Sequence, residues 1–189
     1  MSGISGWMER KLKRLERVRS ALKEHAYDIL TSESFRASDR NIQHGDVSVY
    51  EHSIRVAETA VELARGLRLK VSERELVRGA LLHDYFLYDW HTDGKDAGNV
   101  HPRLHGFFHP GTALKNAKRD FDLTRRESDI IRKHMWPLTI VPPACREAWL
   151  VTAADKYASL METLKLHRGG MVKQHYIELT DDKAGSTDE

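Results

Sequence analysis

The stretch GALLHDYFLYDW, residues 79–90, decides how the rest of this sequence is interpreted. An apolar run with helical spacing leads directly into an imidazole and a carboxylate, His83 and Asp84. A carboxylate that leaves water for a protein interior is destabilised unless an opposite charge or a metal ion compensates for it. We therefore expect His83 and Asp84 to meet partners that other segments of the chain supply.

The spacing of apolar residues predicts an all-α fold, a bundle of five or six helices. Alternating β-branched runs, which indicate strands, are nearly absent. Residues with special roles at helix ends mark the boundaries: Asp46 or Ser48 as a cap, Ser72 with Glu75 as a capping box, Pro110 at a first helical position, and Thr124 as a cap. The first predicted helix ends near residue 30, and one helix begins at residue 110. The other predicted helices cover residues 43–67, 72–87, 123–136 and 143–167.

The chain divides into three parts. Residues 1–43 form an amphipathic helix and a connector that we expect to pack on the core. Residues 44–167 form the main helical domain, and residues 168–189 a polar tail. Within the domain, residues 88–108 lack periodicity, and a polar segment of that length inside a compact domain is usually functional.

The composition excludes several classes of protein. The net charge is only +2, which argues against a dedicated nucleic-acid binder. The single cysteine, Cys145, cannot build a disulfide framework, so we expect a reducing, cytoplasmic setting. The sequence has neither an apolar signal core at its start nor the run of about 20 apolar residues that crosses a bilayer.

Six side chains that can bind metal are predicted to point inward from five segments. His52, for example, lies between Val49 and Val56 at offsets of three and four, on the apolar face of its helix. One buried histidine is commonly a hydrogen-bonded core residue, but six candidates together favour a metal site. They are His52, His83, Asp84, His109, His134 and Asp155.

Four imidazoles and two carboxylates form a ligand set for Fe, Mn, Co or Zn. Adjacent residues on a helix point about 100° apart, so His83 can bind one ion while Asp84 reaches across to a second. The pattern therefore predicts one or two divalent or transition-metal ions.

The order of these residues resembles the HD-domain superfamily, which is named for an adjacent His-Asp pair. The resemblance covers roughly residues 44–166 and includes a first histidine in EHSIRVA, the pair in ALLHDY and a final aspartate in TAADKYAS. Two further histidines, in HPGTAL and RKHMWPL, resemble the dinuclear branch of the superfamily. The GYP tripeptide of the cyclic-dinucleotide phosphodiesterases is missing, so hydrolysis of cyclic-di-GMP is not expected.

The resemblance implies that the six residues are metal ligands and that Asp84, the catalytic residue, is shared by two ions. His52, His83 and Asp155 would complete one site, and His109 and His134 the other. It also implies a phosphohydrolase that cleaves a phosphate ester or anhydride of a small, nucleotide-like substrate with a metal-activated water.

Basic side chains near the ligands are candidates for holding the substrate phosphate. Three are close to a ligand in the sequence, and two belong to the long polar segment; each is also compatible with an ordinary solvated surface position. They are Arg55, Lys133, Lys156, Arg103 and His105.

Three alternatives stay open at this level. A di-iron oxygenase on an HD scaffold uses a similar ligand order, a non-catalytic HD module binds a nucleotide without cleaving it, and a single-metal nucleotidase uses His109 and His134 for its substrate. The substrate, the metal and the oligomeric state do not follow from the sequence.

Overall fold

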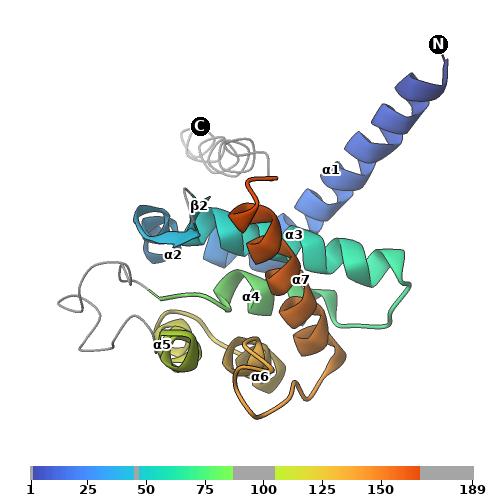
Figure 1. Ribbon diagram of the computed structural model, residues 1–189. Helices are drawn as coiled ribbons and strands as arrows, with labels where there is room; N and C mark the ends of the chain where they lie inside the picture. Colours follow the sequence, from blue (N-terminus) through green and yellow to red (C-terminus); the bar gives the residue numbers. More distant parts are fainter. Residues whose placement is uncertain (1, 45–46, 87–104, 167–189) are drawn as a thin grey trace, which may run out of the picture.

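The computed structural model describes residues 2–44, 47–86 and 105–166, with only the backbone described at 2–5, 44, 105 and 106. Helices dominate these residues, as the sequence predicts (Figure 1). They are α1 Ser2–Thr31, α2 Glu33–Ala37, α3 Val49–Gly66, α4 Glu73–Leu82, α5 His105–Asp120, α6 Arg125–Lys133 and α7 Arg146–Thr163. A 3-10 turn at Ser38–Arg40 and a short antiparallel pair, β1 Ile42–His44 and β2 Val47–Ser48, join α2 to α3.

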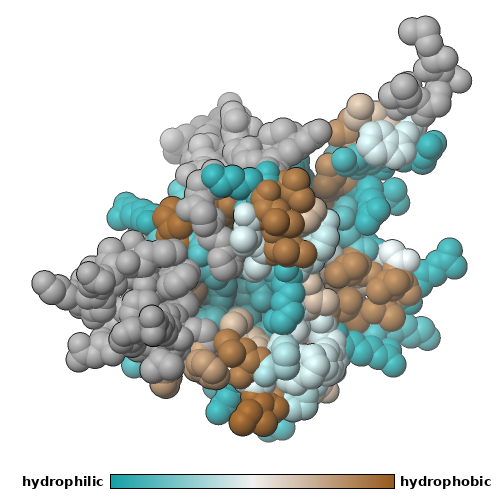
Figure 2. All heavy atoms as spheres, in the orientation of Figure 1, coloured by the Kyte–Doolittle hydropathy of each residue, from teal (hydrophilic) through white to brown (hydrophobic). Residues whose placement is uncertain are grey.

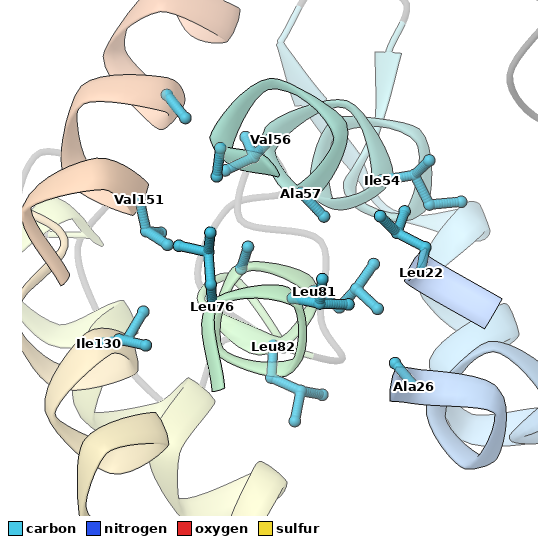
Figure 3. Packing of buried hydrophobic residues seen from close by; sticks show 14 of the residues in the cluster. Leu22, Ala26, Ile54, Val56, Ala57, Leu76, Leu81, Leu82, Ile130 and Val151 are labelled. Atoms are coloured by element: carbon cyan, nitrogen blue, oxygen red, sulfur yellow. The ribbon is translucent and has the colours of Figure 1, made fainter. Parts of the chain in front are cut away.

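Helix α4 lies at the centre of the bundle, in contact with α1, α3, α6 and α7. In the close view, Leu76 and Leu81 of α4 lie among side chains of the surrounding helices (Figure 3). Residues on every side of α4 are fully buried, which is the pattern of a helix enclosed by others rather than one lying on a surface.

One charged residue, Arg78, is buried within α4, and it has two acidic partners. Its Nη1 donates to Asp28 Oδ1 at 2.6 Å, and its Nε lies 3.2 Å from Glu127 Oε1. These two carboxylates come from α1 and α6, so the guanidinium links three helices. Burial of a charge is tolerated here because the charge is paired.

Two of the predicted helix caps are confirmed. The Ser48 hydroxyl accepts the Glu51 N–H at the start of α3. Thr124 and Glu127 form a reciprocal capping box at the start of α6.

Two other helix-start predictions need correction. Ser72 is the N-cap of α4 as predicted, but the capping box with Glu75 is not formed. The Ser72 side chain accepts no capping bond and its N–H donates to Glu147, while Glu75 accepts from Thr124 and Arg126. Pro110 lies inside α5, which begins five residues earlier at His105. His109 is therefore a helical residue rather than the residue before a helix.

The first half of α1 extends away from the bundle, whereas its second half packs on α3 and α4 (Figure 1). Within the packed part, the backbone of Ala26 is non-helical. On the face shown in Figure 2, hydrophobic side chains gather over the C-terminal end of α7, where Leu160, Leu164 and Leu166 are exposed.

None of the helices in the described part of the chain has the length and apolar character of a membrane span.

Gly79 permits the close approach of α4 and α6. A Cβ at this position would lie 2.5 Å from Ile130 Cδ1 and 2.9 Å from Ile130 Cγ2, which is closer than real contacts allow. Because both helices end in predicted metal ligands, this approach also sets the distance between His83 and His134.

We predict that Gly79→Ala destabilises the protein. Overpacking costs about 1–3 kcal/mol, and the better helix propensity of alanine offsets about 1 kcal/mol of that loss. The free energy of unfolding in urea should therefore fall, whereas Gly66→Ala, whose Cβ would meet no atom within 4 Å, should leave it nearly unchanged. Equal stability of the two variants would show that Ile130 moves aside without cost.

Candidate metal centre

The six predicted ligands lie together in the interior of the bundle, and all of them are buried. His52 comes from α3, His109 from α5 and Asp155 from α7. His83 and Asp84 directly follow α4, and His134 directly follows α6. The residues that the sequence predicts as one site are thus brought together from five segments.

The six side chains form two groups that share Asp84. His52, His83, Asp84 and Asp155 form the first group, and Asp84, His109 and His134 the second. Within each group, the potential ligand atoms all lie within 4.8 Å of one another.

The two oxygens of Asp84 face different groups. Oδ2 lies 3.4 Å from His83 Nε2 and 3.8 Å from His52 Nε2, on the side of the first group. Oδ1 lies 3.0 Å from His109 Nε2 and 3.3 Å from His134 Nε2, on the side of the second. One carboxylate therefore faces both groups of potential ligands at once.

The ends of two helices fix the direction of two imidazoles. Nδ1 of His83 lies 2.7 Å from the carbonyl oxygen of Ala80, and Nδ1 of His134 lies 2.8 Å from that of Ile131. A carbonyl only accepts, so each Nδ1 carries the proton. In a neutral imidazole the lone pair is then on Nε2, which faces the centre of the site.

This arrangement fits a metal ion better than it fits a hydrogen-bond network. His83 Nε2 and Asp84 Oδ1 are buried, and neither makes a hydrogen bond to the residues that the structure describes. His109 Nε2 lies only 2.9 Å from His134 Nε2. This is a hydrogen-bond distance when one of the two nitrogens carries a proton, and when neither does, both lone pairs are placed to face one ion.

The electrostatics are consistent with a cation-binding site. Burial alone raises the pKa of Asp84, but the neighbouring His83 and His109 outweigh it and hold this pKa well below its usual value. The pKa of Asp155 is held low against the effect of burial by His52 and His83. Both carboxylates therefore stay ionised, as metal ligands must be.

Two residues that the sequence analysis did not single out support the ligands. Glu162, fully buried on α7, lies with its Oε2 2.8 Å from His52 Nδ1, and its Oε1 accepts from Arg55 Nη1 at 2.9 Å. Glu162 is seven positions after Asp155, two turns along the same helix face, so helical spacing could have identified it. The Gln43 amide of β1 donates to Asp84 Oδ2 at 2.5 Å, and no sequence pattern indicates that contact.

The five predicted substrate-binding residues lie in different surroundings. Arg55 pairs with Glu162, Lys133 pairs with Asp129, and Lys156 Nζ donates to the carbonyl oxygen of His134 at 3.4 Å. Arg103 lies outside the described residues, and His105 begins α5 with a side chain that is likewise not described. Their role toward a substrate stays a prediction.

We predict that Glu162→Gln weakens metal binding without unfolding the protein. An amide still accepts a hydrogen bond from His52, but it lacks the negative charge that strengthens this imidazole as a ligand. Loss of a group that hydrogen-bonds a metal-binding imidazole without itself touching the ion typically lowers metal affinity by about 10–100-fold. The measurement is a competition titration with a metal chelator, with Glu62→Gln as the matched control, since Glu62 pairs with Arg14 and belongs to neither group of ligand candidates. Equal affinities in the two variants would contradict the role of Glu162.

A second prediction concerns the pH dependence of the metal-free protein. Burial lowers the pKa of His52 and of His83, but their carboxylate partners outweigh it and raise these values to about 9 and about 10. A raised histidine pKa stabilises the fold fully below the ordinary value of 6.5, and this stabilisation is lost as pH rises through the folded-state value.

Unfolding of chelator-treated protein should therefore become easier as pH rises from 6.5 toward 9 and above. Metal binds the neutral imidazoles, so the metal-loaded protein should lack this loss. Urea unfolding with and without metal across this range measures the difference. If the two forms show the same pH profile, the two histidines are not the titrating groups.

A comparison with known protein families matches residues 49–160 to the HD domain. The matched segment begins with α3, ends within α7 and contains all six ligand candidates. No significant match was found among curated proteins or among solved structures. Since the matched segment spans more than half of the chain and includes its buried His/Asp cluster, the chain belongs to the HD domain family.

Proposed function

We propose that this HD-domain protein is a phosphohydrolase that cleaves a phosphate ester or anhydride of a small, nucleotide-like substrate. The observation that carries the proposal is the orientation of Asp84, with one carboxylate oxygen toward each of two groups of ligands. A carboxylate shared in this way is suited to two ions that are close together, an arrangement common in phosphoryl-transfer enzymes.

His52, His83, Asp84 and Asp155 would hold one ion, and Asp84, His109 and His134 the other. When bound, such ions supply a water of lowered pKa and offset the negative charge of phosphoryl oxygens. Fe, Mn, Co and Zn all suit this ligand set.

The protein itself supplies orientation and exclusion of water. The Ala80 and Ile131 carbonyls hold the imidazoles of His83 and His134. Glu162 holds His52, and Gln43 holds Asp84. Because all these contacts are buried, the ligands are already in position before a substrate arrives, which lowers the cost of reorganisation during the reaction.

Lys156 is the best placed of the predicted phosphate-binding residues. Its ammonium group is next to the backbone of His134 and makes no ion pair within the described part of the chain. Arg55 and Lys133, by contrast, are already paired with carboxylates. The free charge of Lys156 is therefore available to an anionic substrate close to the second group of ligands.

We predict that the Mn²⁺-loaded protein releases phosphate from nucleotides under anaerobic conditions. Hydrolysis needs only water, whereas the alternative di-iron oxygenase needs iron and O₂. The measurement is a phosphate-release assay over a nucleotide panel in an anaerobic chamber, accompanied by elemental analysis that we expect to show up to two ions per chain. Activity that appears only with iron and O₂ would favour the oxygenase.

The control for this assay is Asp84→Ala. It should lose activity and most of the bound metal while its far-UV circular dichroism stays largely helical. A fully active Asp84→Ala protein would remove the basis of the proposed site, whatever the substrate.

A further inference from the structure

We propose that a groove between α5 and α6 binds a small organic phosphate with a planar apolar group, such as a nucleoside monophosphate, at a place separate from the metal centre. The groove is a cavity of about 650 Å³. Its volume is in the range of roughly 300–1,000 Å³ that is typical of small-molecule sites. None of the six ligand candidates lines it, so this binding site goes beyond the proposed function, although it borders the metal centre at Pro110 and Lys133, which are next to His109 and His134 in the sequence.

The groove follows from the way in which the two helices are joined. Only residues 121–124 connect α5 to α6, and helices with so short a connection form an antiparallel pair. Lys118, at the end of α5, then lies near Arg125, at the start of α6, while Phe107 lies toward Arg132. All four residues line the cavity.

Four cationic side chains and one carboxylate, Asp129, line this groove, so positive charge is in excess. Lys118, Arg125 and Arg132 are exposed, and none of them forms an ion pair with any residue that the structure describes. Neighbouring arginines on the same helices behave differently, since Arg119 pairs with Asp120 and Arg126 with Glu75.

Asp129 pairs with Lys133 of the same groove, which leaves three cations there without a carboxylate partner among the described residues. A concave surface with an excess of charge of one sign attracts ions of the opposite sign. Arginine in particular favours phosphate, because its guanidinium presents several donors in one plane.

The groove also has an apolar wall. Phe107 is 50% exposed and Val141 is 59% exposed, and Leu114 lies between the ends of the groove on α5. An exposed aromatic ring next to cationic side chains is a platform on which a nucleobase can stack. Charge alone would suit inorganic phosphate, whereas the ring and the volume favour a ligand with both a phosphate and a flat apolar part.

The test is a calorimetric titration of AMP into metal-loaded protein and into chelator-treated protein whose helical content is unchanged. AMP should bind in both cases, and adenosine and inorganic phosphate should each bind at least about tenfold more weakly, since each lacks one half of the recognised chemistry. In the chelator-treated protein, the double variant Lys118→Gln/Arg132→Gln should weaken AMP binding by about tenfold or more, the effect of losing a hydrogen bond to a charged group.

The matched control is Lys115→Gln, which removes an exposed charge from α5 outside the groove and should leave AMP affinity unchanged. Phe107→Ala provides an independent variant and should weaken AMP more than inorganic phosphate. The proposal is overturned if AMP does not bind at millimolar concentration or if binding disappears on chelation. It is also overturned if the double variant binds AMP as tightly as the Lys115→Gln control.

Discussion

The carboxylate of Asp84 is buried between two groups of imidazoles, and most of the surrounding structure serves to keep it there in ionised form. A single buried carboxylate destabilises a fold unless positive charge compensates for it. In this protein the compensation comes from the adjacent His83 and from His109 of α5 and His134 directly after α6, which therefore have to meet at the end of α4. The electrostatic requirement of one residue thus dictates how several helices are placed.

Helix α4 can meet this requirement because it is enclosed on all sides. Its residues contact α1, α3, α5, α6 and α7, and its one buried charge, Arg78, is paired with carboxylates of α1 and α6. The absence of a side chain at Gly79 lets α6 approach, which brings His134 toward His83. Packing and chemistry are therefore coupled, since the contacts that build the core also determine the distances between ligands.

The fold class and most of the six ligand candidates could be predicted from local periodicity, whereas the prediction of His109 rests on its position before Pro110 and on the resemblance to the HD-domain superfamily. His52 and Asp155 lie on apolar helix faces, and His83 and Asp84 end an apolar run. What could not be predicted depends on contacts between distant segments. Gln43 reaches Asp84 from a strand of only three residues, and the helix α5 continues through Pro110, whose usual effect is to begin or interrupt a helix.

His83 and His134 are both oriented by the main chain, through carbonyl groups three residues before them at the ends of α4 and α6. The partner of each imidazole is a main-chain carbonyl, which no substitution of a side chain removes. The site should consequently tolerate many substitutions along α4 and α6 but not a change in their length. One inserted residue would turn the following imidazole by about 100° and remove it from the centre. Over evolutionary time, insertions are thus expected in the connections between these helices rather than within them.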